Sequence, residues 1–137
     1  MSGDEEVKGW KILVVDDDED NRAVAAQYLA FLGAEVRTAE NGADGLEALR
    51  SFMPTFVLLD LSMPEMDGWE MHRQLRANPA TAGLPVIALT AHAMQEDAHK
   101  ALADGFDGYI TKPFLLNTLI ADIKKALAEF DKRHPMP

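Results

Sequence analysis

The sequence contains no cysteine, which excludes a disulfide framework, a thiolate zinc site and a thiol nucleophile. It also lacks any apolar run near the roughly 18 residues that a membrane-spanning helix requires. The longest strongly apolar runs, Ile12–Val15 and Phe56–Leu59, have the length of strands. Basic clusters are absent as well, since the longest is Lys124-Lys125. With a formal net charge of −10, nucleic acid is an unfavourable direct partner because its phosphates would be repelled.

What is present fits one globular domain. The chain has 137 residues, of which 47% are hydrophobic, so a single core can bury most of the apolar surface. The first residues, Met1–Lys8, are acidic and polar, unlike a signal peptide. We therefore expect a cytoplasmic protein with no membrane partner.

Short runs rich in Val, Ile and Leu alternate with longer segments of helical spacing. Five strands are expected, at Lys11–Asp16, Ala34–Ala39, Phe56–Asp60, Leu84–Thr90 and Gly108–Thr111. Several of these runs are apolar at consecutive positions, which is typical of strands buried on both faces. Five strand–helix units predict an α/β fold with a parallel sheet, helices on both faces and right-handed crossovers.

The intervening segments carry helix signals. The first helix has Asp20 as its expected N-cap and Gly33 just past its end. Further helices are expected after Asn41-Gly42, after Asp67, at Met94–Asp104 and from Leu116 through Phe130. The apolar face of the fourth is mostly alanine, so it buries little area, and we expect it to be the most mobile element.

Charged and polar residues follow the predicted strands. Asp16 and Asp17 end the first strand, Asp60 ends the third, Thr90 ends the fourth, and Lys112 follows the fifth. In an open parallel sheet, ligands bind beyond the carboxyl ends of the strands. Three carboxylates, one hydroxyl and one amine are therefore expected to converge at one edge.

Such a group of side chains predicts phosphoryl transfer. Clustered carboxylates repel one another unless a cation is present, and Mg²⁺ suits carboxylates, waters and a phosphate oxygen. A carboxylate beside Mg²⁺ can attack phosphorus to give an aspartyl-phosphate. The metal and a lysine then neutralise the transferring phosphoryl group, and a hydroxyl can donate a hydrogen bond to it.

A set of short motifs, each weak alone, is highly specific in its order and spacing. The motifs are Val14-Val-Asp-Asp17, Leu58-Leu-Asp60, Met63-Pro64, Asp67-Gly68, Leu89-Thr-Ala91 and Tyr109-Ile-Thr-Lys-Pro-Phe114. Together they resemble the receiver domain of two-component response regulators. The resemblance covers residues 10–132, leaving residues 1–9 as a flexible acidic N-terminal tail and 133–137 as a C-terminal tail. It implies a flavodoxin-like, doubly wound, five-stranded parallel sheet in the order 2-1-3-4-5 with five helices.

The resemblance also implies a role for each site residue. Asp60 would accept a phosphoryl group from the phosphohistidine of a histidine kinase or a histidine phosphotransfer protein. Asp17, Asp60 and the backbone carbonyl of Ser62 would ligate Mg²⁺ directly, and Asp16 would help to hold the metal through water. Lys112 would contact both the phosphoryl group and Asp60.

Other roles implied by the resemblance concern switching and phosphoryl lifetime. Thr90 would move to bind a phosphoryl oxygen, and Tyr109 would swing inward into the space that opens. Ser62 and His92 occupy the two positions that tune phosphoryl lifetime. The bond Lys112-Pro113 resembles the family's cis peptide, although only about 5–6% of X–Pro bonds are cis in folded proteins.

The implied function is a phosphorylation-dependent switch that acts catalytically only on itself. Too few residues follow Phe130 for an output domain, so we expect a free-standing protein that signals through contacts with an unknown downstream protein. The fourth helix, the neighbouring strand and the last helix form the expected readout face. A monomer and a phosphorylation-dependent dimer both remain open, and a receiver excised from a larger hybrid kinase would look similar.

Rival interpretations make different demands on the residues. An aspartyl-phosphate hydrolase of the haloacid dehalogenase kind needs a second acid two residues after the nucleophile, where this chain has Ser62. A flavodoxin-like FMN protein needs a loop rich in Gly, Ser or Thr after the first strand, and here that loop is acidic. A receiver-like adaptor that is never phosphorylated is a third alternative, which the intact site disfavours. The four histidines, His72, His92, His99 and His134, do not have the spacing of a metal site.

Overall fold

The computed structural model describes residues 7–61, 67–90, 95–112 and 115–133 of the 137-residue chain. Its sheet has five parallel strands in the order β2-β1-β3-β4-β5, which confirms the predicted topology. The strands are β1 (Lys11–Val15), β2 (Glu35–Ala39), β3 (Phe56–Asp60), β4 (Val86–Thr90) and β5 (Gly108–Thr111).

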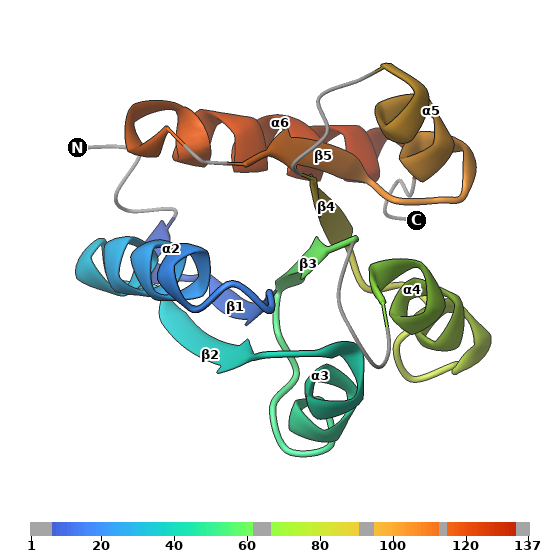
Figure 1. The fold of residues 1–137 in the computed structure, drawn as a ribbon, viewed down its shortest axis with the longest axis horizontal. Coiled ribbons are helices and arrows are strands. Elements are labelled where there is room, and N and C mark those ends of the chain that lie inside the picture. Colours follow the sequence, from blue (N-terminus) through green and yellow to red (C-terminus); the bar gives the residue numbers. More distant parts are fainter. Residues whose placement is uncertain (1–6, 62–66, 91–94, 113–114, 134–137) are drawn as a thin grey trace.

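In the described parts of the chain, five helices cover the two faces of this sheet (Figure 1). They are α2 (Glu19–Phe31), α3 (Gly42–Ala48), α4 (Gly68–Ala77), α5 (Gln95–Ala103) and α6 (Leu116–Arg133). Helices α2 and α6 contribute to the hydrophobic cluster on one face of the sheet, and α3, α4 and α5 contribute to the cluster on the other. The architecture is therefore a three-layer α/β fold, as the alternation of apolar runs predicts.

Consecutive residues of the central strands face opposite layers. In β1, Ile12 and Val14 belong to the cluster shared with α2 and α6, whereas Leu13 and Val15 belong to the cluster on the other face. All four side chains are fully buried. Burial on both faces is the physical reason for the uninterrupted apolar runs in the sequence.

Most helix starts agree with the capping signals, but the first one does not. Asp67 caps α4, as expected, and Asn41, which was predicted only to lie in the turn before a helix, caps α3. Helix α2 is capped by Asp18 and not by Asp20, because Asp18 has an extended backbone and its side chain accepts a hydrogen bond of 3.1 Å from the amide of Asn21. Asp20 already lies inside the helix, so the predicted cap was wrong by two residues.

The packed structure reaches further at both ends than the boundaries of residues 10 and 132 drawn from the sequence. Val7 is fully buried in the core beside Trp10, and its carbonyl accepts a hydrogen bond from the Trp10 amide. Arg133, in the last turn of α6, donates a 2.8 Å hydrogen bond to Asp107. None of the helices in the described parts of the chain is long and apolar enough to cross a membrane.

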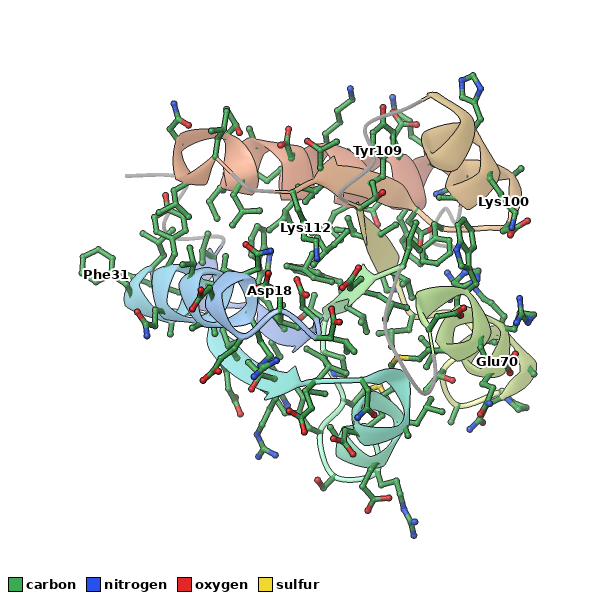
Figure 2. The ribbon with its side chains drawn as sticks, in the orientation of Figure 1. Asp18, Phe31, Glu70, Lys100, Tyr109 and Lys112 are labelled. Atoms are coloured by element: carbon green, nitrogen blue, oxygen red, sulfur yellow. The ribbon has the colours of Figure 1, made fainter. Side chains whose placement is uncertain are left out.

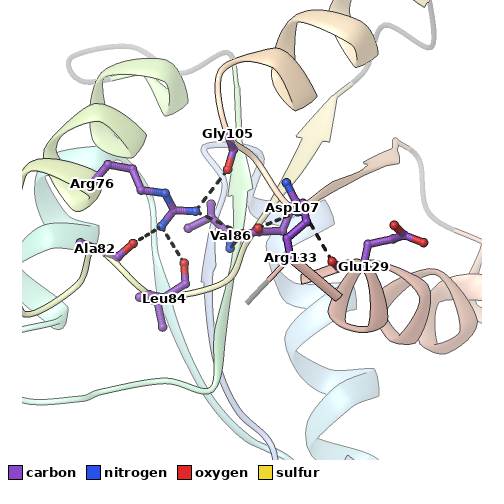
Figure 3. A network of polar contacts seen from close by, with 8 residues as sticks. All are labelled: Arg76, Ala82, Leu84, Val86, Gly105, Asp107, Glu129 and Arg133. Atoms are coloured by element: carbon purple, nitrogen blue, oxygen red, sulfur yellow. Dashed lines mark hydrogen bonds and ion pairs between the residues drawn. The ribbon is translucent and has the colours of Figure 1, made fainter. Parts of the chain in front are cut away.

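A buried polar network ties the elements together at the amino ends of the strands (Figure 3). Asp107 is 3% exposed and accepts hydrogen bonds from Arg76 (3.1 Å), Arg133 (2.8 Å) and the amide of Val86 (2.8 Å). Arg76 also donates to the carbonyls of Ala82, Leu84 and Gly105. One carboxylate therefore connects α4, β4 and the end of α6 to the turn before β5.

Candidate functional site

Three acids meet at the opposite edge of the sheet, beyond the carboxyl ends of β1 and β3. One carboxylate oxygen from each of Asp16, Asp17 and Asp60 lies within 4.8 Å of the others. Asp16 and Asp60 are buried, at 0% and 2% exposure, while Asp17 is exposed. The parallel register places them together because β1 and β3 are neighbours that end at the same edge.

Lys112 lies between the two buried acids. Its Nζ donates to Asp16 Oδ1 at 3.2 Å, to Asp16 Oδ2 at 3.3 Å and to Asp60 Oδ2 at 3.2 Å. Burial alone would lower the Lys112 pKa, but the charges of Asp60 and Asp16 and the hydrogen bonds to them outweigh it and raise the pKa. In Figure 2 the Lys112 side chain points toward the middle of the molecule. The amine therefore stays charged beside Asp60.

The amide, the carbonyl and the carboxylate of Asp16 all make hydrogen bonds. Its amide donates to the carbonyl of Ala39 in β2, and its Oδ1 accepts a 2.9 Å hydrogen bond from the amide of Asp18. Its carbonyl accepts a 2.7 Å hydrogen bond from Arg22 Nη1. Arg22 was not predicted as part of the site, because the sequence of a first helical turn does not indicate which backbone carbonyl an arginine side chain will reach.

The backbone of Asp60 is closely approached by the start of α4. The amide of Gly68 donates to the carbonyl of Leu61 at 3.2 Å. A Cβ atom at Gly68 would overlap the carbonyl oxygen of Asp60 and would lie 2.8 Å from the Leu61 Cα. Only glycine fits here, which gives the Asp67-Gly68 motif a steric reason next to the expected phosphoacceptor.

Thr90 and Tyr109 differ in their exposure. Thr90 is 4% exposed at the end of β4, and its carbonyl accepts a 2.8 Å hydrogen bond from the amide of Lys112. Tyr109, on β5, is 44% exposed, so its ring lies outward (Figure 2). The predictions that concern Ser62, His92 and the Lys112-Pro113 bond fall on residues 62, 92 and 113, outside the described residues.

The donor set fits a hard divalent cation. Three carboxylates with oxygens this close repel strongly unless a positive charge lies between them, and carboxylate oxygens are the ligands that Mg²⁺ prefers. Lys112 already neutralises part of the charge of Asp16 and Asp60. Asp17 is the exposed member of the group and is open to a ligand from solvent.

Comparison with known proteins identifies the family. Residues 12–124 match the family model described as "Response regulator receiver domain". The chain therefore belongs to the response regulator receiver domain family. Receiver domains are regulatory phosphoacceptors of two-component signalling, and phosphorylation on Asp and Mg²⁺ binding at an acidic cluster are typical of them.

Individual relatives agree with this assignment. The chain is 45% identical over 102 residues to an uncharacterized 14.6 kDa protein in the sodA1 3′ region of Leptolyngbya boryana, covering 74% of this chain and 78% of that protein. It is 38% identical over 122 residues to the sensor histidine kinase RcsC of Salmonella typhimurium, covering 89% of this chain but only 12% of RcsC.

The fold also matches a solved structure. The chemotaxis response regulator CheY4 of Vibrio cholerae superposes with a TM-score of 0.79 at 28% identity, covering 85% of this chain and 97% of CheY4. The match spans nearly all of CheY4 and a small part of RcsC, so relatives of this chain occur both as short proteins and as parts of long ones.

Proposed function

We propose that this chain is a Mg²⁺-dependent switch that accepts a phosphoryl group on Asp60. The observation that carries the proposal is the meeting of Asp16, Asp17 and Asp60 with Lys112 at the carboxyl edge of the sheet. A phosphohistidine on a histidine kinase or a histidine phosphotransfer protein is the proposed donor. An Asp60 carboxylate oxygen attacks phosphorus, the bond from phosphorus to the histidine nitrogen breaks, and a carboxyl–phosphate bond forms.

Each residue has a part in this reaction. Asp17, Asp60 and the carbonyl of Ser62 would hold Mg²⁺, with Asp16 assisting through water. The metal supplies positive charge to the phosphoryl oxygens. Lys112, already 3.2 Å from an Asp60 oxygen, moves its hydrogen bond from the carboxylate to the phosphoryl group. Residues Ser62 and His92 would tune how long the phosphoryl group lasts.

Phosphorylation then acts through a difference in contacts between two states. The phosphoryl group adds about −1.5 to −2 charges and strong acceptor oxygens. The Thr90 hydroxyl donates a hydrogen bond to a phosphoryl oxygen, a contact that exists only in the phosphorylated state, and the Tyr109 ring moves from its outward position into the space that Thr90 leaves. Only such a differential contact can shift an existing equilibrium.

The readout is proposed to be a protein contact made by α5, β5 and α6. Support comes from the exposed side of β5 and from a groove of about 450 Å³ between β5 and α6, lined by Tyr109, Ile110, Lys125 and Glu129 among others. We propose a cytoplasmic, free-standing protein that signals to a downstream protein in trans, as a monomer or as a dimer formed on phosphorylation.

The decisive test is the intact mass of the protein after incubation with acetyl phosphate. We expect a single phosphoryl adduct that needs Mg²⁺, is lost with a chelator and is absent from Asp60→Asn. Asp104→Asn, which changes an exposed acid on the turn after α5, is the matched control and keeps the adduct. No adduct, under conditions that label another receiver, would favour the adaptor alternative.

A further inference from the structure

We propose that Arg22 is a positioning residue that holds Asp17 in place as a metal ligand. The inference rests on the proposed function, since it concerns the same Mg²⁺ site. Arg22 itself is not a metal ligand, and among the described residues it bonds none of the three carboxylates.

The first observation is the contact that Arg22 makes. Its Nη1 lies 2.7 Å from the backbone carbonyl oxygen of Asp16, a short, charge-assisted hydrogen bond. Its own amide donates to the carbonyl of Asp18 at 2.9 Å, which fixes Arg22 in the first turn of α2. Within the described residues no carboxylate pairs with the guanidinium. The guanidinium of Arg22 therefore bonds the peptide group between Asp16 and Asp17 and no acidic side chain of the described residues.

The second observation concerns the other side of Asp17. The amide of Asp18, in the peptide group after Asp17, donates to Asp16 Oδ1 at 2.9 Å. Both peptide groups that flank Asp17 are thus fixed, one through its carbonyl by Arg22 and the other through its N–H by Asp16. Rotation of either group would redirect the Asp17 side chain, so the two hydrogen bonds restrict where its carboxylate can point.

The third observation is that the Asp17 carboxylate is itself available. It is exposed, and no hydrogen bond or ion pair to it occurs among the described parts of the chain, whereas Asp16 and Asp60 are both bonded to Lys112. A fixed backbone with an available carboxylate is a partly preorganised ligand, since only the side-chain torsions of Asp17 remain to be ordered on binding.

Arg22 has two opposite effects on metal affinity, one from its charge and one from its hydrogen bond, so the direction of the change on mutation shows which of them dominates. As a positive charge near the site, the guanidinium repels a metal ion, so Coulomb's law alone predicts tighter metal binding when it is removed. As a clamp on the Asp16–Asp17 peptide, it favours the binding geometry, so its removal weakens metal binding. Residues that orient metal ligands typically change metal affinity by about 10–100-fold when mutated.

The experiment measures binding of Mn²⁺ alone to the full chain, by counting free Mn²⁺ with electron paramagnetic resonance at fixed ionic strength. Mn²⁺ takes the same oxygen ligands as Mg²⁺. We expect Arg22→Met to weaken Mn²⁺ binding by about tenfold or more. Arg22→Lys, which keeps a charged donor, should lie between Arg22→Met and the wild type.

Arg73→Met is the matched control, because it makes the same change of charge and shape at an exposed position on α4. It should leave Mn²⁺ affinity within about twofold of wild type, since Arg73 is exposed to solvent that screens its charge and is paired with Glu70. Urea unfolding of each variant shows whether the protein is folded during the measurement. If Arg22→Met does not fold, Arg22→Gln, which is also uncharged and too short to bond the carbonyl in the same way, takes its place.

The change in Mn²⁺ affinity of Arg22→Met distinguishes the possible roles of Arg22. Weaker Mn²⁺ binding by folded Arg22→Met, with partial recovery in Arg22→Lys, supports the clamp. Unchanged or tighter binding overturns it, because the charge then dominates or the contact serves only stability. A wild-type protein that binds no Mn²⁺ and gives no Asp60 adduct would instead defeat the proposed function, a result distinguishable from failure of the clamp.

Discussion

At the scale of single residues, the two buried carboxylates of the site depend on one amine. Asp16 and Asp60 are almost fully buried and both bond Lys112. Removing one partner of a buried ion pair typically costs about 3–5 kcal/mol, because the remaining charge is left without compensation. We predict that Lys112→Met lowers the free energy of unfolding by about 3 kcal/mol at pH 7. The measurement is urea unfolding with and without Mg²⁺.

Added Mg²⁺ should recover more stability in Lys112→Met than in wild type, because the ion replaces the positive charge that the variant has lost beside Asp16 and Asp60. Lys125→Met, which removes an exposed lysine from α6, is the control for loss of a surface charge. Equal stability of the two variants would show that Lys112 does not stabilise the acid cluster.

Gly68 is a second residue on which the site depends. Because a Cβ atom there would overlap the Asp60 carbonyl, Gly68→Ala must displace either the end of β3 or the start of α4. We expect a loss of about 1–3 kcal/mol in stability, typical of overpacking, together with slower labelling of Asp60 by acetyl phosphate. Gly83→Ala is the control, since a Cβ at Gly83 meets nothing within 4 Å. Normal labelling of folded Gly68→Ala would contradict the prediction.

The site residues divide by the kind of signal that reveals them. Asp16, Asp17, Asp60 and Lys112 were predictable because they follow strands, and the carboxyl ends of parallel strands meet at one edge. The contact of Arg22 was not, because its partner is a backbone carbonyl, and backbone groups are the same at every position. A side chain that recognises backbone leaves no partner residue in the sequence to search for.

At the scale of elements, the run of acids after β1 creates a choice that sequence alone did not resolve. Asp18 and Asp20 are both good caps, but only one can precede the first helical residue. We predict that Asp18→Ala destabilises the protein by about 1 kcal/mol, since the amide of Asn21 loses its acceptor, while Asp20→Ala has a smaller effect. Thermal unfolding of both variants provides the test. A larger loss in Asp20→Ala would mean that the helix starts later in solution.

Two strands were predicted with the bounds that the structure shows. The bounds Phe56–Asp60 and Gly108–Thr111 agree with the structure to the residue. The first and fourth strands were predicted too long: β1 ends at Val15 and β4 begins at Val86, two residues after Leu84. In both places buried residues continue past the ladder, so burial alone could not show where strand pairing ends.

At the scale of the whole molecule, one histidine links stability to pH. His72 is 3% exposed, stacks on Phe106 with ring centroids 4.0 Å apart, and its Nε2 has no hydrogen-bond partner among the described residues. Burial lowers the His72 pKa to about 4, and the charge of Arg76 acts in the same direction. In the pH range between 4 and 6.5 the unfolded chain therefore binds more protons at this residue than the folded protein.

The pKa of His72 is lower in the folded protein than in the unfolded chain, so its contribution to the free energy of unfolding is fully present above pH 6.5. That contribution is lost as the pH falls toward 4. The expected loss from this residue is about 3 kcal/mol between those limits. We predict that His72→Phe, which keeps an aromatic ring against Phe106, loses less stability than wild type over the same range of pH. The measurement is urea unfolding at pH 7, 6, 5 and 4.

The exposed His99 offers the matched control for this comparison. His99→Gln should follow the pH dependence of wild type, since an exposed side chain on α5 can be replaced with little change in packing. Parallel curves for wild type and His72→Phe would show that the acid sensitivity arises elsewhere.

The network around Asp107 has a consequence for how α5 can move. Arg76 bonds the carbonyl of Gly105 and the carboxylate of Asp107, so the turn after α5 is fastened to α4 at the edge of the sheet away from the acid cluster (Figure 3). A helix that is held at its C-terminal end can move mainly at its N-terminal end. We therefore expect any rearrangement of α5 to pivot about Gly105 and to be largest at Gln95, the end that follows the strand bearing Thr90.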